Sequence, residues 1–303
     1  MRLLLRHVAL AALACNGMFG CATFHKGPMP GEPKDASFAQ VGNTRMRYTD
    51  RGKGPAVVMI HGFASSLETW DLVAPQLARN HRVITVDLRG FGWTDRPEQA
   101  DYSPIGQARL VQDLLDQRGV EKSAIVAHSW GTSVALVMAL QQPHRFTRLA
   151  LYDAWAYEEQ LPTTFIWARA EVVGEILFDW YYKERGEDKL AQAFYDKRFI
   201  TQQLVDDVER ALDRPGTTAA ALAAVRGMRY DLWEHRYKTI QQPVLLLWGR
   251  EDSTSTLAIG ERLHRDLPNS RMIVYPRCGH LPMLEAAAAS NADLISFLDE
   301  DLK

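Results

Sequence analysis

The sequence predicts an α/β fold, in which a mostly parallel central sheet is flanked by helices. Three observations predict it. Short apolar runs alternate with segments of helical spacing over most of the 303 residues, which is typical of a parallel sheet with helical crossovers. One apolar run ends at a serine between small residues and passes directly into a helical segment. Later in the chain, a long helical segment rich in aromatic residues interrupts the alternation.

Composition and charge narrow the class of protein before any motif is considered. The chain is 47% hydrophobic with a formal net charge of −2, so it can bury a large core and offers no basic stripe to nucleic acid. The sequence contains no glycine-rich phosphate loop and no His, Cys, Asp and Glu cluster with convincing metal-ligand spacing. We therefore expect no nucleic-acid partner, no cofactor and no metal.

Residues 1–20 are typical of a signal peptide. Arg2 and Arg6 precede a short apolar run at residues 8–14, as in a secretory signal. The run is too short for a confident membrane span, which needs about 20 apolar residues.

Cys21 resembles the cleavage site of a bacterial lipoprotein, because a small residue precedes it and alanine follows it. The resemblance implies that Cys21 becomes the lipidated first residue, carrying acyl chains such as palmitate. Residues 21–36 contain several Gly and Pro and are interpreted as a tether. Cys15 is the competing site, and a plain secretory peptide is the simpler alternative. We expect a membrane-anchored lipoprotein of the bacterial cell envelope, periplasmic or held at the outer membrane.

The body of the chain begins with an expected hairpin at residues 38–41 and 45–50. Buried strands are expected at residues 56–60, 82–87, 124–127, 148–153, 244–248 and 271–275. A helix is expected to begin at Ser103-Pro104, since serine is a good N-cap and proline suits the first helical position. A last helix is expected at residues 285–302.

Ser129 stands where an apolar strand meets a helix. A serine on so sharp a turn projects its hydroxyl clear of the backbone, but strand and helix nearly collide there. The residues two before and two after must therefore be small, and they are Ala127 and Gly131. Serine is a poor nucleophile at neutral pH, so it needs a base, and the base needs an orienting acid.

Two later loops supply these groups, each directly after an expected strand, where a parallel sheet presents its functional residues. His280 lies in the loop after the last strand and is the candidate base. Asp252 follows the preceding strand and is the candidate acid. Asp153, at the end of the sixth strand, is the rival acid, whereas Glu251 falls one residue short of the usual spacing.

These motifs together resemble the α/β-hydrolase family, in its capped esterase, haloperoxidase and epoxide-hydrolase-like branch. The resemblance covers residues 38–302. It is carried by His61-Gly62-Phe63, by residues 87–92, by His128-Ser129-Trp130-Gly131, by residues 249–252 and by Gly279-His280. Ala127 departs from the usual Gly-x-Ser-x-Gly pattern. Haloalkane dehalogenases and epoxide hydrolases of this family carry aspartate at the nucleophile position, so Ser129 argues against both.

The resemblance implies an acyl-enzyme mechanism with Ser129, His280 and Asp252 as the triad. It also implies that the backbone amides of Phe63 and Trp130 form the oxyanion hole. The predicted activity is hydrolysis of carboxylic esters of a small to medium hydrophobic molecule. Hydrolysis of C–C bonds, aminopeptidase or amidase action, and perhydrolysis are alternatives on the same triad. A non-catalytic surface lipoprotein is the alternative outside enzymes.

The family also places a helical cap after the sixth strand. We expect the cap at residues 154–237, between a first core segment at residues 37–153 and a second at residues 238–303. Its many aromatic residues suit an apolar pocket that excludes water, although most of them are expected to form the core of the cap.

Overall fold

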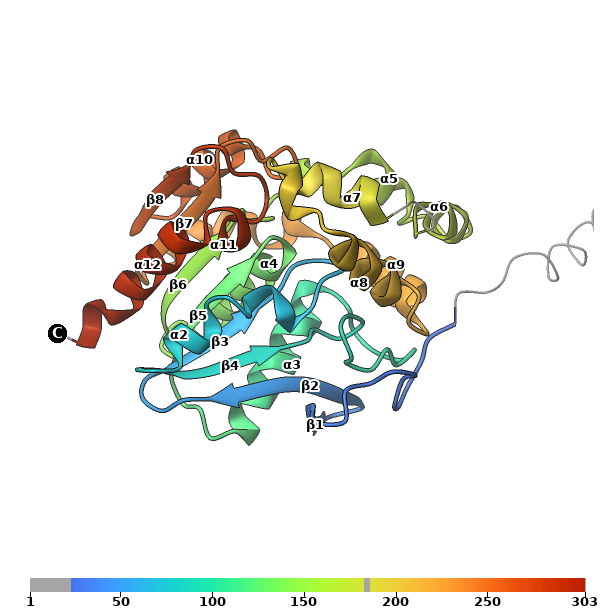
Figure 1. Ribbon diagram of the computed structural model, residues 1–303, viewed down its shortest axis with the longest axis horizontal. Coiled ribbons are helices and arrows are strands. Elements are labelled where there is room, and N and C mark those ends of the chain that lie inside the picture. Colours follow the sequence, from blue (N-terminus) through green and yellow to red (C-terminus); the bar gives the residue numbers. More distant parts are fainter. Residues whose placement is uncertain (1–22, 183–185, 303) are drawn as a thin grey trace, which may run out of the picture.

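Figure 1 shows the computed structural model, which describes residues 23–182 and 186–302. Eight strands form one sheet in the order β1-β2-β4-β3-β5-β6-β7-β8. The strands are β1 (Ser37–Val41), β2 (Thr44–Arg51), β3 (Ala56–Ile60), β4 (Arg82–Val86), β5 (Ser123–His128), β6 (Phe146–Tyr152), β7 (Val244–Gly249) and β8 (Ser270–Tyr275). β2 is antiparallel to β1 and β4, and the other neighbours are parallel. The predicted α/β fold is confirmed.

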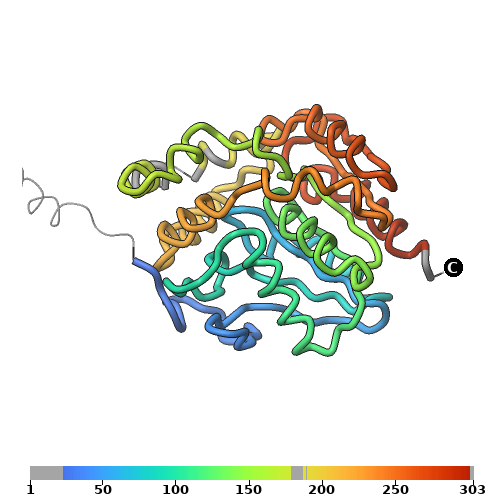
Figure 2. The backbone as a smooth tube through the Cα atoms, turned by 180° about the vertical axis from the view of Figure 1, so that it is seen from behind, coloured from blue at the N-terminus to red at the C-terminus, as the bar shows by residue number. Residues whose placement is uncertain are grey.

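Helices cover both faces of the sheet (Figures 1 and 2). The core helices are α2 (Ala74–Leu77), α3 (Pro104–Gln117), α4 (Trp130–Gln141), α10 (Leu257–Asp266), α11 (Pro282–Glu285) and α12 (Ala287–Leu298). Successive side chains of a strand point to opposite faces, so the apolar run of β3 serves two cores. Val58 and Ile60 pack with α3 and α4, whereas Val57 and Met59 pack with α2 and α12.

The start of α3 and the last helix can be compared with the sequence predictions. Ser103 caps α3 as expected, because its hydroxyl accepts a hydrogen bond from the amide of Gly106 at 3.2 Å. The last helix predicted at about residues 285–302 is present as α12, which is followed by a 3-10 turn, η7 (Asp299–Leu302). A separate short helix, α11, precedes it, and the chain leaves the α region between them at Ala286, where ψ is 33°.

The helical cap lies between β6 and β7, at one end of the parallel strands (Figures 1 and 2). Its helices are α5 (Thr163–Trp167), α6 (Val173–Tyr182), α7 (Gly186–Ala193), α8 (Gln202–Leu212) and α9 (Thr217–Arg226), with 3-10 turns η3 (Glu158–Gln160), η4 (Lys197–Phe199), η5 (Tyr230–Leu232) and η6 (Glu234–Thr239). The insertion of a helical cap after the sixth strand is confirmed. Most of its described aromatic residues are buried, and the exposed ones are Trp167, Tyr195 and Phe199.

Asp87, at the end of β4, organises the loops around it. Its carboxylate is fully buried and accepts hydrogen bonds from the amides of Leu67, at 2.7 Å, and Trp93, at 2.8 Å. Arg47 on β2 approaches the same carboxylate at 3.4 Å. A buried charge needs such partners, so Asp87 ties the loop after β3 to the loop after β4.

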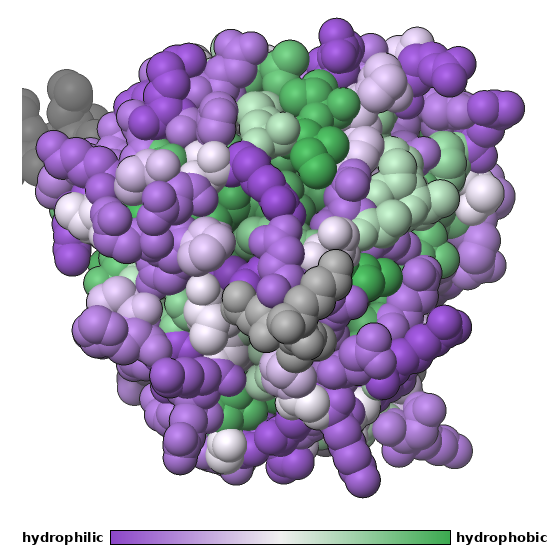
Figure 3. All heavy atoms as spheres, turned by 90° about the vertical axis from the view of Figure 1, so that its left-hand side faces the viewer, coloured by the Kyte–Doolittle hydropathy of each residue, from purple (hydrophilic) through white to green (hydrophobic). Residues whose placement is uncertain are grey.

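The side of the molecule that carries α12 and the C-terminal end is mainly polar. Figure 3 shows hydrophilic side chains over most of this side, with smaller apolar areas between them. Among the residues that the structure describes, no helix has both the length and the apolar character needed to cross a bilayer. The predicted signal peptide and Cys21 lie outside the described residues.

Candidate active site

Ser129 has a strained backbone at the junction of β5 and α4. Its φ is 49° and its ψ is −126°, a combination that costs a non-glycine residue free energy and persists only where neighbours enforce it. Its amide donates to the carbonyl of Tyr152 at 2.9 Å. Its own carbonyl accepts from the hydroxyl of Thr132 at 2.6 Å and from the amide of Trp155 at 3.2 Å. Three segments therefore hold the turn.

The close approach predicted at this turn is present. A methyl group at Gly131 would collide with the carbonyl oxygens of His61 and Ile60 at the end of β3. Gly62 is similarly confined, since a Cβ there would lie 3.0 Å from the Cβ of Ser129. Ala127 is fully buried within β5, so its methyl group is accommodated despite the departure from the usual pattern.

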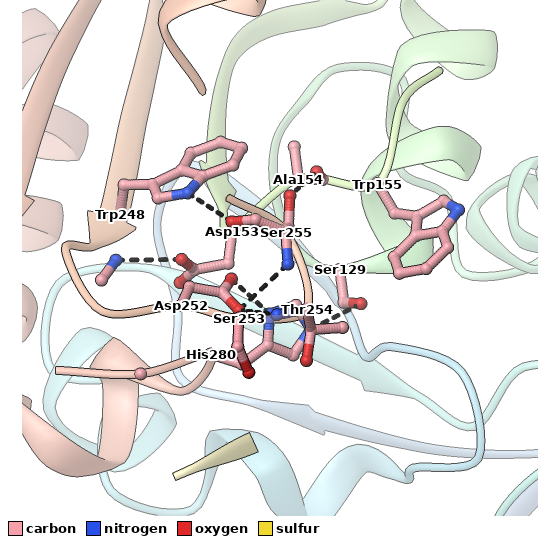
Figure 4. Close-up of polar contacts among 12 residues, drawn as sticks. Ser129, Asp153, Ala154, Trp155, Trp248, Asp252, Ser253, Thr254, Ser255 and His280 are labelled. Atoms are coloured by element: carbon pink, nitrogen blue, oxygen red, sulfur yellow. Dashed lines mark hydrogen bonds and ion pairs between the residues drawn. The ribbon is translucent and has the colours of Figure 1, made fainter. Parts of the chain in front are cut away.

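The structure brings Ser129, His280 and Asp252 together (Figure 4). The Oγ of Ser129 lies 2.9 Å from Nε2 of His280, and Nδ1 of His280 lies 2.6 Å from Oδ2 of Asp252. A carboxylate can only accept, so Nδ1 carries a proton toward Asp252 and Nε2 is left to accept the hydroxyl proton of Ser129. This is the geometry that a serine nucleophile and its base require.

Asp252 is held as a charged acceptor. Its Oδ1 accepts hydrogen bonds from the amides of Thr254, at 2.7 Å, and Ser255, at 3.0 Å. Burial acts to raise the pKa of Asp252, but the facing His280 and these two amides outweigh it and hold the pKa below its usual value. The carboxylate is therefore ionised at neutral pH and can stabilise an imidazolium.

The loops that carry the acid and the base pass very close to each other. A Cβ at Gly249 would collide with the carbonyl oxygen of Gly279, so glycine is required at the end of β7. Glu251, on the acid loop, accepts from the amide of Cys278 at 2.9 Å. Glu285 accepts from the amide of Gly279 at 2.8 Å.

Glu251 and Glu285 therefore brace the histidine loop, and sequence reasoning missed both roles. From the sequence, Glu251 is only an acid that falls one residue short of the usual triad spacing. Glu285 lies only six residues after Gly279, but its other oxygen accepts from the amide of Asp196 in the cap at 2.8 Å, and no local signal reveals that contact.

His128 and His61 are two further histidines near Ser129, and both are buried. Nε2 of His128 donates to the carbonyl of His280 at 2.8 Å. Nδ1 of His61 donates to the carbonyl of Gly62 at 2.7 Å, and its Nε2 accepts from the amide of Leu88 at 3.0 Å. Burial lowers the pKa of His128 to about 3 and lowers that of His61, so both rings are neutral.

The backbone amides of Phe63 and Trp130 are the predicted oxyanion donors. Within residues 23–182 and 186–302, neither amide donates to another protein group. His61 holds the carbonyl of Gly62, and a trans peptide directs the following N–H to the opposite side. The Phe63 amide is thus oriented by a buried ring, while the Trp130 amide is one of the unpaired donors at the start of α4.

Aromatic side chains connect this region to the cap. The ring of Phe63 packs against Phe165 of α5 at 5.7 Å between centroids, and against Trp130 at 6.0 Å. Phe91 contacts both Phe63 and Trp130. The cap also reaches the triad loops directly, since the amide of His280 donates to the carbonyl of Ala193 at 2.7 Å.

In the described part of the chain, the group of side chains close enough to share a metal ion is Asp153, Asp252 and His280. Two ligand atoms of a tetrahedral zinc ion, each about 2.0 Å from the metal, lie about 3.3 Å apart. Oδ2 of Asp252 and Nδ1 of His280 are only 2.6 Å apart. The spacing fits a shared proton and not a shared metal.

Comparisons with known proteins identify the family to which this fold belongs. The family model of the alpha/beta hydrolase fold matches residues 55–287. The chain is 30% identical to an uncharacterized hydrolase of Bacillus subtilis (strain 168), over 77% of this chain and 86% of that protein.

Two further matches are named for a more specific reaction. A 2-hydroxy-6-oxononadienedioate/2-hydroxy-6-oxononatrienedioate hydrolase of Comamonas testosteroni is 29% identical, over 84% of this chain and 92% of that protein. The meta-cleavage product hydrolase of Pseudomonas fluorescens IP01 superposes with a TM-score of 0.73 at 26% identity, covering 88% of this chain and 98% of that one.

The packing of Gly131 predicts that Gly131→Ala lowers stability and activity more than a change at Ala127 does. The new methyl group must displace the end of β3, where the Phe63 amide is held. We expect a loss of about 1–3 kcal/mol in the free energy of unfolding and a clear fall in turnover. Ala127→Gly, measured beside it in urea unfolding and activity assays, should remain active. Equal activity for Gly131→Ala and the parent would contradict the packing argument.

The buried neutral histidines predict that stability falls in mild acid. The ordinary histidine pKa of 6.5 applies to the unfolded chain, whereas folding lowers that of His128 to about 3. Between these two pKa values only the unfolded state takes up the proton. The contribution of the neutral ring to the free energy of unfolding is therefore fully present above pH 6.5. It declines as pH falls, by up to about 1.4 kcal/mol per pH unit for each such histidine. Urea unfolding at several pH values measures the slope. His128→Gln should reduce it, and an unchanged slope would refute the assignment.

Proposed function

Because the chain belongs to the α/β-hydrolase family, we propose that it is a serine hydrolase that cleaves carboxylic esters through Ser129, His280 and Asp252. The observation that carries the proposal is the continuous hydrogen-bonded chain from Ser129 through His280 to Asp252, at 2.9 and 2.6 Å. Each member is buried to more than nine-tenths. Such a chain activates a hydroxyl that is otherwise unreactive at neutral pH.

The reaction proceeds in two steps. His280 takes the proton of Ser129 as the hydroxyl oxygen attacks the ester carbonyl, and Asp252 stabilises the resulting imidazolium. The imidazolium protonates the leaving alcohol, and an acyl group remains on Ser129. His280 then deprotonates a water molecule, which attacks the acyl-enzyme and releases the acid. The amides of Phe63 and Trp130 stabilise the oxyanion in both steps, and losing one such donor costs about 10²–10³ in kcat.

The surroundings of the site support a hydrophobic substrate. The rings of Phe63, Phe91, Trp130 and Phe165 pack against one another next to the oxyanion amides. Apolar rings at this position favour an apolar acyl or alcohol group on the substrate. We therefore propose esters of small to medium hydrophobic molecules.

Hydrolysis of a C–C bond is the second candidate. It is supported by the relatives from Comamonas testosteroni and Pseudomonas fluorescens, which are named for hydrolysis of 2-hydroxy-6-oxo acids and of meta-cleavage products. The triad suits attack on a ketone as well as on an ester. Aminopeptidase action has less support. Of the acids that could bind a substrate amine, Glu158 and Glu159 pair with Arg169 and Arg262 at 2.6 and 2.8 Å. The third, Glu171, is exposed to solvent.

The proposal is tested by measuring the hydrolysis of p-nitrophenyl esters, from acetate to laurate, by the full-length protein. Ser129→Ala should reduce turnover by at least about 10³-fold. Ser123→Ala, at the opposite end of β5, is the matched control and should remain active. A 2-hydroxy-6-oxodienoate assayed in parallel separates the second candidate. No turnover of either class, together with no fluorophosphonate labelling of Ser129, would favour the non-catalytic alternative.

We also propose that Cys21 anchors the protein to a membrane of the bacterial envelope. The support is the sequence pattern of residues 1–22. In cells grown with labelled palmitate, we expect the protein to acquire the label and Cys21→Ser to lose it, while Cys15→Ser keeps it. If Cys21→Ser keeps the label and Cys15→Ser loses it, the anchor is at Cys15. If the parent protein acquires no label, the proposal of a lipid anchor is rejected.

A further inference from the structure

A second buried carboxyl group, Asp153, lies beside the triad and takes no part in the mechanism above. It follows the end of β6 with a positive φ of 41° and is fully buried. Its Oδ1 accepts a hydrogen bond from the amide of Gly249 at 2.9 Å. Within the described residues, no N–H or O–H group donates to its Oδ2. A buried carboxyl oxygen in that situation is costly, so its protonation state needs an explanation.

The neighbours of Asp153 decide which carboxyl group carries the charge. A carboxyl oxygen of Asp153, one of Asp252 and a ring nitrogen of His280 all lie within 4.8 Å of one another, and Figure 4 shows the two carboxyl groups next to each other. Two carboxylates this close in a dry site do not both ionise. Asp252 receives hydrogen bonds from two amides and from His280, whereas Asp153 receives one. The charge therefore belongs to Asp252.

The electrostatic surroundings agree with this assignment. Burial, and then the charge of Asp252, raise the pKa of Asp153 well above its usual value. Glu285 acts in the same direction. The other titratable groups facing Asp153 are the Cys278 thiol and the Tyr152 hydroxyl, and burial raises the pKa of each, so they stay neutral and do not stabilise a second negative charge.

We propose that Asp153 is a neutral carboxylic acid whose hydroxyl donates to Asp252, so that it positions the triad carboxylate without adding a charge. The proposal rests on the serine-hydrolase function above. Asp153 does not touch the reacting atoms, so it is a positioning residue. It connects the ends of β6 and β7, since the Gly249 amide that it accepts from precedes the acid loop. Its neutrality also matters for His280, because a second negative charge there would favour the imidazolium and weaken the base at neutral pH.

Two substitutions distinguish a neutral hydrogen-bonding Asp153 from one that is purely structural and from one that is ionised. Asp153→Asn keeps an acceptor for the Gly249 amide and a donor for Asp252, so we expect kcat/KM near that of the parent and an unchanged acidic limb of the pH profile. Asp153→Ala removes both, and we expect kcat/KM to fall about 10- to 100-fold, as for the loss of a hydrogen bond to a charged group.

Two outcomes of the kinetic test would overturn the proposal. If Asp153→Asn lowers kcat/KM as much as Asp153→Ala, the ionised group is needed. If Asp153→Asn moves the acidic limb to lower pH, a negative charge has been removed from beside His280. The asparagine variant decides both points, even if Asp153→Ala fails to fold.

Infrared spectroscopy gives a readout that does not depend on turnover. At pH 7 the full-length parent should show the carbonyl stretch of a buried protonated carboxylic acid, and Asp153→Asn should lose it. Asp113→Asn, a change on the exposed side of α3, should keep it. A parent spectrum without this band would overturn the proposal. If no substrate is turned over, the band still shows whether Asp153 is protonated. Failure of the proposed function can therefore be told apart from failure of the proposal for Asp153.

Discussion

The strained turn at Ser129 is the constraint on which the rest of the site depends. A left-handed φ at a serine is sustained here because β6, α4 and the start of the cap all donate to or accept from its backbone. The same turn requires Gly131 to lie against the end of β3. The positions of the nucleophile, the proposed oxyanion amides and the sheet are therefore set by one local packing arrangement, in which a free-energy cost at one residue is offset by contacts of its neighbours.

Acidic side chains have different roles in this protein according to their partners. Asp252 is ionised because two amides and an imidazole face it, and Asp87 holds two loops through their amides. Glu251 and Glu285 hold the histidine loop in the same way. The loops around the site are thus held by carboxylates that accept hydrogen bonds from backbone amides. Such partners are needed because these segments have no regular secondary structure to pair the amides.

The strands, the hairpin and the triad order could be predicted because their signals are local: apolar runs, a helix cap at Ser103, and functional residues directly after strands. The meeting of Ser129, Asp252 and His280 followed from sheet topology and from the family resemblance. The roles of Glu251 and Glu285 could not be predicted in this way, because Glu251 accepts from Cys278 on the histidine loop and Glu285 also accepts from Asp196 in the cap. These contacts depend on which segments lie side by side in space, and no periodicity in the sequence carries that information.

The contact between the cap and the histidine loop has a consequence for how this protein can change. The carbonyl of Ala193, at the end of α7, holds the amide of the base, and the carbonyl of Gln192 accepts from Ser253 beside the acid. The cap is thus a support for the loops of the proposed acid and base. A foreign cap grafted onto this core would have to keep the carbonyl groups at the end of α7, whatever substrate its other helices suited.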